Sequence, residues 1–335
     1  MRIGVYCPNW VGDAVMAIPF FNAIRQQHPN DKIFAVCKSS VEPIFKNHSA
    51  INEIISFEKK DLYGIRANRN SGRSLKAMDL DVFYLLSNTY RSAYLAKKSK
   101  TPMRIGYPGQ WRTSMLTDVV DRSKEKMHRY KKYLKLLMNQ NIDFKSMLNP
   151  GIIISKEEKK WARTTLSNLE IHEFIALFPF SIATSRSLPK QKILDLVKKT
   201  DESIIIFGGK DDKYKGEILV GTSKRRNIHS LAGLYNLRQS MALISQSKGA
   251  IASDSGLGHI SGNLGIPTVT LFGAGDAAQT RPLGGQTHII NADVHCSPCL
   301  KNKCSNRNEP LLCLEEIKPK QVWGILSELG LPLQI

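Results

Sequence analysis

The sequence predicts an α/β protein built from two doubly wound domains that face each other across a cleft. Short apolar runs alternate with helix-like segments along the chain, which is the pattern of parallel strands joined by crossover helices. This alternation lapses between Asn141 and Ile154 and then starts again. The length of 335 residues also favours about two domains. We place the boundary at the Asn149-Pro150-Gly151 breaker, which gives domains 1–150 and 151–335.

The first domain opens with a strand followed by a helix. Ile3–Cys7 is an apolar run, and Asn9–Pro29 repeats apolar side chains at the spacing of a helix with one buried face. Runs rich in Val, Ile and Phe and further helical spacing define the next elements. They are strands at Lys32–Cys37 and Asp81–Leu86 and helices at Thr89–Lys97 and Met127–Asn139.

The second domain contains continuous apolar runs, which indicate parallel strands covered on both faces. The runs are Phe174–Phe178, Ser203–Phe207, Gly249–Ser253 and Thr268–Phe272. Helical segments separate them at Pro189–Thr200, Lys213–Gly221, Leu234–Ser245 and Gly256–Leu264. The last segment, Pro319–Leu329, has a proline in its first turn, where the missing amide costs nothing, and predicts a terminal helix.

The composition is that of a soluble globular protein, with 42% hydrophobic and 23% charged residues. Every apolar run is far shorter than the ~18 residues that a membrane-spanning helix needs. The first residues enter a strand pattern without a leader segment. We therefore expect a cytoplasmic protein.

The net charge of +19 favours polyanionic partners, which include nucleic acid, an acidic membrane leaflet or a phosphorylated substrate. The excess is concentrated between Arg91 and Lys135, where thirteen basic residues accompany three acidic ones. A solvated surface explains such a run equally well. Aromatic residues are interleaved with these charges, but no nucleic-acid module accompanies them, so we expect no nucleic-acid partner.

Asp13 follows Gly12 where the first strand passes into the first helix. Aspartate is a favoured helix N-cap, because its carboxylate accepts hydrogen bonds from first-turn amides. The other interpretation is a functional acid or base, since open α/β sheets place their ligands at the carboxyl ends of strands. The residues of this segment alone leave both interpretations open.

Four strand ends in the second domain carry small, hydroxyl-bearing or basic residues. They are Pro179–Pro189, which contains Arg186, and the segments Phe207–Asp212, Ser253–His259 and Leu271–Gly275. Glycine-rich turns and helix N-termini admit phosphate groups. Ordinary turn chemistry explains any one of them, and His259 alone reads as a structural helix residue. Together they predict a site for a nucleoside diphosphate.

Three motifs carry a family resemblance: Asn9-Trp10-Val11-Gly12-Asp13, the segment Asp254–His259, and Cys296-Ser297-Pro298-Cys299. They resemble glycosyltransferase family 9, and the Trp-Val-Gly-Asp form is most similar to its heptosyltransferase II branch. The resemblance runs from the first strand to the terminal helix. It implies the GT-B architecture of two Rossmann-like domains, with the acceptor bound by 1–150 and the nucleotide sugar by 151–335.

The reaction that the resemblance implies is an inverting transfer of heptose from ADP-heptose to the inner core of a lipid A-linked acceptor. Such an acceptor places the enzyme at the anionic surface of the inner membrane as a peripheral protein, and the resemblance implies no metal or cofactor in the reaction. The turn Gly273-Ala274-Gly275 is looser than the family's usual Gly-Pro-Thr/Ser, which leaves another nucleotide sugar or core acceptor open. A basic, nucleotide-dependent RNA-binding protein is the alternative from another class.

By the same resemblance, Asp13 is the general base and Ser181 contacts the phosphates. Arg186 stands where the family has a lysine on the diphosphate, and it replaces a point charge by a planar fork. Asp212, or its neighbour Asp211, is expected at the ribose. The donor motif itself is matched by Asp254, Ser255, Gly256 and His259.

The six cysteines fall into two groups. Cys7 and Cys37 lie in apolar strand patterns and are expected to be buried thiols. The other four follow the spacing C-x2-C-x4-C-x8-C and are Cys296, Cys299, Cys304 and Cys313. The opening C-x2-C fits a zinc or iron–sulfur site, whereas the later spacings are irregular. A structural metal is therefore left open, and a disulfide is less favoured in a reduced compartment.

Overall fold

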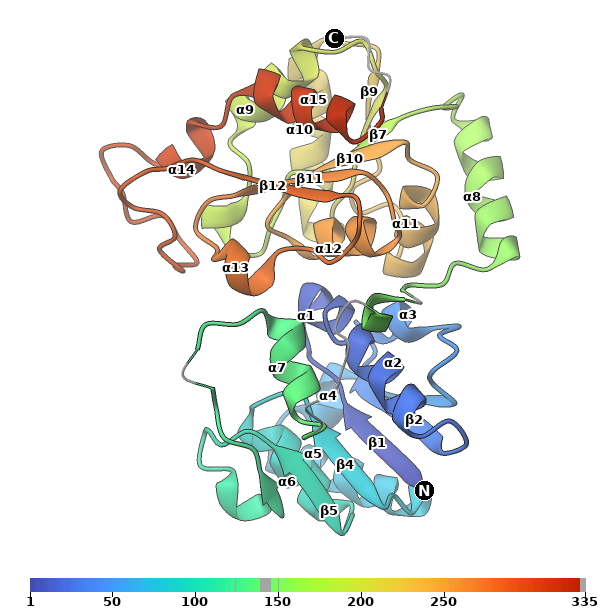
Figure 1. The fold of residues 1–335 in the computed structure, drawn as a ribbon. Coiled ribbons are helices and arrows are strands. Elements are labelled where there is room, and N and C mark those ends of the chain that lie inside the picture. The colour runs from blue at the N-terminus through green and yellow to red at the C-terminus, as the bar shows by residue number, and fades with distance from the viewer. Residues whose placement is uncertain (124, 139–145, 150, 332–335) are drawn as a thin grey trace. The chain divides into compact units, whose positions relative to one another are not determined.

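The computed structural model describes residues 1–123, 125–138, 146–149 and 151–331 (Figure 1). The chain divides into two compact units, Met1–Ile153 and Ile154–Ile335, and each unit contains a six-stranded sheet. The predicted α/β class with two doubly wound halves is confirmed. The expected boundary at residue 150 falls beside this division.

Unit 1 has a parallel sheet with the order β3-β2-β1-β4-β5-β6. Its strands are β1 (Arg2–Tyr6), β2 (Lys32–Lys38), β3 (Glu53–Phe57), β4 (Val82–Leu85), β5 (Met103–Gly106) and β6 (Asp118–Val119). Ile3 of β1 pairs with Ile33 on one side and with Val82 on the other. The first strand in the chain is therefore central in the sheet.

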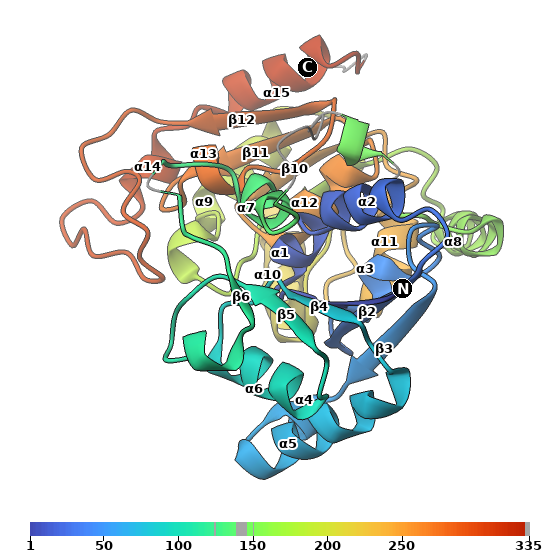
Figure 2. The ribbon, with the colours of Figure 1, turned by 60° about the horizontal axis from the view of Figure 1, so that its bottom comes forward.

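The helices of unit 1 cover both faces of this sheet, with α4, α5 and α6 on one face and α2 and α7 on the other (Figure 2). Their bounds are α1 (Val11–Val15), α2 (Ile18–Gln27), α3 (Glu42–Phe45), α4 (Lys59–Leu62), α5 (Ile65–Ser74), α6 (Tyr90–Lys98) and α7 (Arg129–Lys135). Short 3-10 helices are η1 (Leu75–Met78), η2 (Thr113–Met115) and η3 (Ser146–Leu148).

The single helix predicted over Asn9–Pro29 is wrong in one respect, because the structure has two helices there, α1 and α2. Pro19 is the cause: it has no amide to donate to the carbonyl one turn earlier, and its ring clashes with that carbonyl. The chain therefore starts a new helix, with Pro19 in the first turn of α2. Asn139, the expected end of the later helix, lies outside the described residues.

Unit 2 has a parallel sheet with the order β12-β11-β10-β7-β8-β9. Its strands are β7 (Ile175–Phe178), β8 (Ile204–Ile206), β9 (Ile228–Ser230), β10 (Gly249–Ser253), β11 (Thr268–Phe272) and β12 (Thr287–Asn291). Every side chain of β7, β8, β10 and β11 is buried. This burial explains why these four strands read as continuous apolar runs.

The helices of unit 2 lie on both faces of the sheet, with α9, α10 and α15 on one face and α11 and α12 on the other (Figure 1). Their bounds are α8 (Lys156–Asn168), α9 (Lys190–Lys198), α10 (Lys213–Ser223), α11 (Leu237–Ile244), α12 (Gly256–Asn263), α13 (Ala277–Thr280), α14 (Leu312–Glu315) and α15 (Pro319–Glu328), with 3-10 helices η4 (Thr184–Arg186) and η5 (Lys210–Asp212). The predicted terminal helix is α15. Its fully buried Trp323 links it to α9, because the Trp323 Nε1 donates to the Leu196 carbonyl at 3.0 Å.

Both sheets share one topological feature that positions ligands. The chain runs outward from β1 through β2 and β3 and then resumes at β4 on the other side of β1. In unit 2, β7 and β10 stand in the same relation. At such a switch point the loops that leave two neighbouring strands diverge and open a crevice at their carboxyl ends.

No helix in the described parts of the chain is long and apolar enough to cross a membrane.

Candidate active site

The switch point of unit 2 brings together two of the residues singled out from the sequence. Ser181 follows β7, and Asp254 follows β10. The Ser181 hydroxyl donates to the Asp254 carbonyl oxygen at 3.4 Å. One residue earlier in each segment, the Ser253 hydroxyl donates to the Phe180 carbonyl oxygen, also at 3.4 Å. Hydroxyl groups therefore tie the two strand ends together across the crevice.

Arg186 reaches the same place from η4. Its Nη1 lies 3.3 Å from Oδ2 of Asp254, whose side chain is 4% exposed. The Arg186 side chain is 30% exposed, and its buried Nε has no hydrogen-bond partner among the described residues. Because a guanidinium has five N–H donors, Arg186 can hold Asp254 and still donate to an anion.

The N-terminus of α12 lies next to this pair. Ser255 is the N-cap residue, and its side chain makes no capping hydrogen bond. Its buried hydroxyl has no partner among the described residues. Gly256 starts the helix without a side chain to cover the first-turn amides, and His259 is buried one turn later. Free first-turn amides and the helix dipole favour an anion at this position.

The turn after β11 presses directly against Asp254. A Cβ atom built on Gly275 would lie 2.0 Å from Oδ2 of Asp254, which is far inside contact distance. Gly275 is required for the close approach of backbone to a buried carboxylate.

The two aspartates considered for the ribose occupy different environments after β8. Asp212 has both carboxylate oxygens engaged: Oδ2 accepts from the Gly209 amide at 3.1 Å, and Oδ1 accepts from Nζ of Lys215 at 2.9 Å. Asp211 is exposed. Asp212 thus fixes the turn into α10. The turn itself borders the crevice, because a Cβ on Gly208 would lie 2.9 Å from the Phe180 ring.

Asp13 is placed at the switch point of unit 1. It lies in the first turn of α1, whose N-cap residue is Trp10, so the interpretation of Asp13 as the N-cap is wrong. Oδ2 of Asp13 accepts from Nη1 of Arg129 at 3.2 Å, and the Asp13 side chain is 19% exposed. Tyr133, one turn further along α7, is buried beside them: burial raises the pKa of its phenol, and the charge of Asp13 raises it further.

Arg129 is a functional candidate that the sequence analysis missed, because it counted this residue only as part of the basic stretch. Arg129 is the first residue of α7. Its guanidinium donates to the carboxylate of Asp13, which is 116 positions away in the chain. A partner at that separation leaves no periodic signal in the sequence.

Several other arginines of the basic stretch also serve the fold of unit 1. Arg112 is completely buried, and its guanidinium donates to the Tyr107 carbonyl and to the Ser92 hydroxyl, each at 3.0 Å. Arg104 donates to the Met115 carbonyl at 2.8 Å, and Arg122 donates to the Pro108 carbonyl at 2.7 Å. The interpretation of this stretch as a surface, whether solvated or binding a polyanion, is therefore wrong for Arg112. Lys124 lies outside the described residues.

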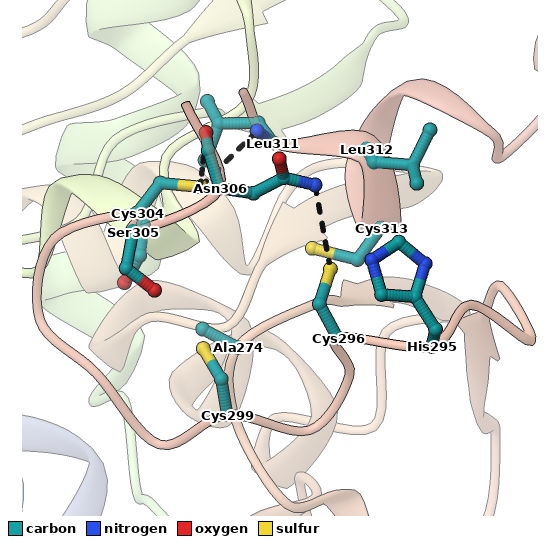
Figure 3. Close-up of a pocket in the computed structure, with 11 residues that line it drawn as sticks. Ala274, His295, Cys296, Cys299, Cys304, Ser305, Asn306, Leu311, Leu312 and Cys313 are labelled. Atoms are coloured by element: carbon teal, nitrogen blue, oxygen red, sulfur yellow. Dashed lines mark hydrogen bonds between the residues drawn. The ribbon is translucent and has the colours of Figure 1, made fainter. Parts of the chain in front are cut away.

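The six cysteines are all free thiols. Cys7 and Cys37 are buried as expected, and burial raises the pKa of Cys37 to about 12. The other four line one cavity of about 240 Å³ together with His295 (Figure 3). Burial raises the pKa of the Cys313 thiol, and the neighbouring Cys296, Cys299 and Cys304 raise it further. The described residues include no group of three or more His, Cys, Asp or Glu side chains that could hold a metal ion.

The chain is similar in sequence and in fold to known heptosyltransferases. Lipopolysaccharide heptosyltransferase 2 of Escherichia coli is 28% identical to the chain, over 87% of the chain and 88% of the relative. Lipooligosaccharide heptosyltransferase 2 of Campylobacter jejuni is 24% identical, over 99% of the chain and all of the relative. The solved E. coli ADP-heptose lps heptosyltransferase II has a TM-score of 0.79 and 23% identity, with 98% of both chains covered. A family 9 structure from Veillonella parvula has a TM-score of 0.82 and 20% identity, with 98% of this chain and 96% of that one covered.

The model of the family described as glycosyltransferase family 9 (heptosyltransferase) matches residues 69–309. This match covers the whole candidate site of unit 2 together with Arg129, Cys296, Cys299 and Cys304. The chain therefore belongs to glycosyltransferase family 9, and the protein is a glycosyltransferase.

Proposed function

We propose that this glycosyltransferase moves heptose from ADP-heptose to the inner core of a lipid A-linked acceptor. Unit 2 binds the nucleotide sugar, and unit 1 binds the acceptor. The relatives named for lipopolysaccharide and lipooligosaccharide heptosyltransferase 2 support this choice of donor and acceptor. The observation that carries the donor assignment is the junction of Arg186, Asp254 and the α12 N-terminus at one switch point.

In this proposal the diphosphate of the donor lies between Arg186 and the first-turn amides of α12. Transfer breaks the bond between the sugar and the diphosphate, so negative charge grows on the leaving ADP. Fixed donors that already point at this position stabilise the charge without reorganisation. Asp254 positions the Arg186 guanidinium. The remaining donor contacts are assigned to Ser181, Ser255, Gly256 and His259, with Asp212 at the ribose.

Asp13 acts as the general base in unit 1. A sugar hydroxyl is a weak nucleophile, and a carboxylate that accepts its proton contributes about 10²–10⁴-fold to the rate. Arg129 donates to one oxygen of this carboxylate at 3.2 Å and thereby orients it. Direct attack without a covalent enzyme intermediate inverts the anomeric centre.

A panel of nucleotide sugars tests the donor assignment. We expect ADP release from ADP-heptose in the presence of a core acceptor that lacks the transferred heptose, followed by coupled spectrophotometry. UDP- and GDP-linked hexoses serve as controls, and they should release little diphosphate. Faster diphosphate release from another nucleotide sugar would mean that this member of the family uses a different donor.

We propose further that the protein works as a peripheral protein at the cytoplasmic surface of the inner membrane. Its acceptor would sit in an anionic leaflet, and each adsorbed Lys or Arg contributes about 1 kcal/mol near such a surface. The basic stretch would supply this charge, and several of its arginines also donate to groups inside unit 1. Between residues 124 and 132 the structure describes three of its lysines, Lys126, Lys131 and Lys132, and Lys126 is exposed.

Vesicle co-sedimentation tests this membrane role. The protein should bind vesicles that contain anionic lipid and not neutral ones, and added salt should weaken the binding as it shortens the screening length. Reversal to glutamate at Lys126, Lys131 and Lys132 should remove most of the bound fraction. A control that reverses three exposed lysines of α8, Lys156, Lys159 and Lys160, has the same net charge and should keep more binding. An equal loss of vesicle binding in both variants would mean that the net charge of the protein, and not this stretch, causes the binding.

A further inference from the structure

Trp111 is 96% exposed, and no large apolar side chain of the described residues has a greater exposed fraction. It lies in unit 1, in the loop that follows the carboxyl end of β5 and leads to η2. Single exposed apolar side chains are common, but tryptophan is highly buried on average, and an indole left in water is unfavourable. A reason is therefore needed for the outward position of this ring.

The backbone that presents Trp111 has an unfavourable conformation. Gln110 and Trp111 have φ angles of 47° and 57°, so two consecutive residues other than glycine are left-handed. This conformation is uncommon for residues with a Cβ atom, and more so for bulky ones. Such strain persists only where the surrounding contacts determine it, and it is concentrated at functional sites.

The fully buried Arg112 fixes one end of this loop. Its Nε donates to the Tyr107 carbonyl at 3.0 Å, and its Nη1 donates to the Thr89 carbonyl at 3.3 Å and to the Ser92 hydroxyl at 3.0 Å. Its buried Nη2 has no hydrogen-bond partner among the described residues. Burial lowers the pKa of Arg112 to about 10, with a smaller contribution from the charge of Arg122. Because a buried cation held by neutral acceptors is unfavourable, the loop is fixed at a cost in stability.

Two further hydrogen bonds connect the loop to its neighbours. Oε1 of Gln110 accepts from the Tyr90 amide in the first turn of α6 at 3.0 Å, and Arg122 donates to the Pro108 carbonyl at 2.7 Å. Strand β5 and helix α6 lie side by side in unit 1 (Figure 2). These contacts place Trp111 next to the start of α6.

The side chains around this loop form an aromatic and basic surface. Tyr90, Arg91 and Arg122 are exposed. The guanidinium carbon of Arg91 lies 5.7 Å from the centroid of the exposed Tyr63 ring. We call Tyr63, Tyr90, Arg91, Trp111 and Arg122 the aromatic–basic patch. Residues 82–117, which include three of these five, contain six Lys or Arg and no Asp or Glu, so the surface suits a negatively charged partner.

We propose that the aromatic–basic patch attaches unit 1 to an anionic lipid leaflet, with the Trp111 indole inserted at the level of the headgroups. Tryptophan and tyrosine favour this level because their rings are apolar and carry one polar group. Arg91 and Arg122 contact the lipid phosphates. This inference deepens the membrane role proposed above and rests on it.

The inserted ring adds something that charge alone does not supply. Attraction between basic side chains and an anionic leaflet falls off within a screening length and weakens with salt. Burial of an indole among lipids depends little on salt, and stable attachment of a peripheral protein generally needs two such contributions. The outward position of Trp111 is thereby explained, because only a protruding ring reaches past the headgroups.

The protrusion of Trp111 favours a membrane over two other partners of aromatic and basic surfaces. Sites for sugars and other small ligands are concave and cover most of the ligand. Single-stranded nucleic acid stacks its bases on aromatic rings along a charged groove. A ring that is 96% exposed protrudes from the surface instead of lining a hollow.

Tryptophan fluorescence of the full-length protein on acceptor-free vesicles tests the insertion. The anionic vesicles contain phosphatidylglycerol and phosphatidylethanolamine, and phosphatidylcholine vesicles are the neutral control. On anionic vesicles, wild-type emission should shift to shorter wavelength and should be quenched by lipids with brominated acyl chains. Both effects should disappear in Trp111→Phe. The matched control Trp10→Phe, which removes a 61% exposed indole of the same unit, should keep both.

Co-sedimentation separates the contribution of the ring from that of the charges. Trp111→Ala should lower the affinity for anionic vesicles about tenfold, because one large apolar side chain is no longer buried. Its remaining binding should disappear with added salt, whereas the wild type should keep part of its binding. Trp10→Ala should bind like the wild type. Trp10 is a suitable control because its side chain makes no capping hydrogen bond in α1.

Transfer assays separate contact with lipid from contact with the acceptor sugar. For an acceptor embedded in anionic vesicles, Trp111→Ala should raise KM about tenfold. For a soluble acceptor without acyl chains, its KM and kcat should stay within about twofold of the wild-type values. ADP affinity should not change, because the donor site lies in unit 2.

Four results would overturn the proposal. Equal quenching by brominated lipid in wild type and Trp111→Phe would exclude insertion of this ring and leave the electrostatic membrane role standing. A raised KM of Trp111→Ala for the soluble acceptor would assign the ring to the acceptor sugar. Quenching of Trp111 by single-stranded RNA, without any by anionic vesicles, would assign the patch to nucleic acid. A wild-type protein that binds no anionic vesicles would contradict both the patch and the membrane role, whereas heptose transfer to the soluble acceptor would stand.

Discussion

Asp13→Asn should lower kcat by at least about 10²-fold while the affinity for ADP stays at the wild-type value. The amide has the shape of the carboxylate but cannot accept the proton of the acceptor hydroxyl, so the loss is that of general base catalysis. Asp13 lies in unit 1, so the donor site of unit 2 keeps all its own groups. Steady-state kinetics with saturating donor and acceptor measure kcat, and calorimetry measures ADP binding.

A matched control for this change is Asp121→Asn, which makes the same substitution at an exposed carboxylate of unit 1. It should leave kcat within about twofold, because exposed substitutions without specific contacts have small effects. Turnover of Asp13→Asn near the wild-type rate would restrict Asp13 to binding Arg129. Loss of ADP binding in Asp13→Asn would show that the variant acts through something other than proton transfer.

Arg186→Ala should weaken ADP binding by about 1.5–3 kcal/mol, a factor of roughly 10 to 150. Two effects add in the same direction. The diphosphate loses charge-assisted hydrogen bonds, and the buried Asp254 loses the guanidinium at 3.3 Å that compensates its negative charge. Without this guanidinium, the carboxylate beside the phosphates repels them more strongly. Calorimetric titration with ADP gives the change directly.

Arg225→Ala is the control for this prediction. Arg225 lies before β9, at the opposite edge of the same sheet, where it contacts Asp201 at 2.7 Å. Its removal takes the same charge from unit 2 without touching the crevice. The two variants should therefore differ by about tenfold or more in ADP affinity. Equal affinities would mean that the diphosphate binds away from Arg186 and that the assignment of η4 to the donor site is wrong.

The central strands were predictable from the sequence, and several edge strands were not. Apolar runs identify β7, β8, β10 and β11 because both faces of these strands are buried. In β3 and β12 exposed and partly exposed residues dominate, since an edge strand is covered less completely. Their sequences therefore lack a continuous apolar run, and each sheet has more strands than the sequence predicts.

The candidate donor site was predictable to the extent that it depends on strand ends. Parallel strands deliver their carboxyl ends to one edge, so Ser181 and Asp254 had to lie near each other once β7 and β10 were neighbours. The burial of Arg112 was not predictable in the same way. Its acceptors include backbone carbonyl oxygens of a folded loop, which exist as a set only after the loop has formed. A count of charges along the sequence assigns such a residue to the surface.

In each sheet the strand that comes first in the chain is central, and this has a consequence for the order of folding. β1 can pair early with the nearby β2, whereas the β1–β4 pair joins Ile3 to Val82 and the β7–β10 pair joins Ile175 to Gly249. Contacts between residues so far apart close slowly, because the loop entropy must be overcome first. The crevices beside Asp13 and Asp254 exist only after these last pairings. ADP should therefore bind only after unit 2 has folded completely. During refolding, ADP binding should appear with the slowest folding phase rather than with the initial collapse of the chain.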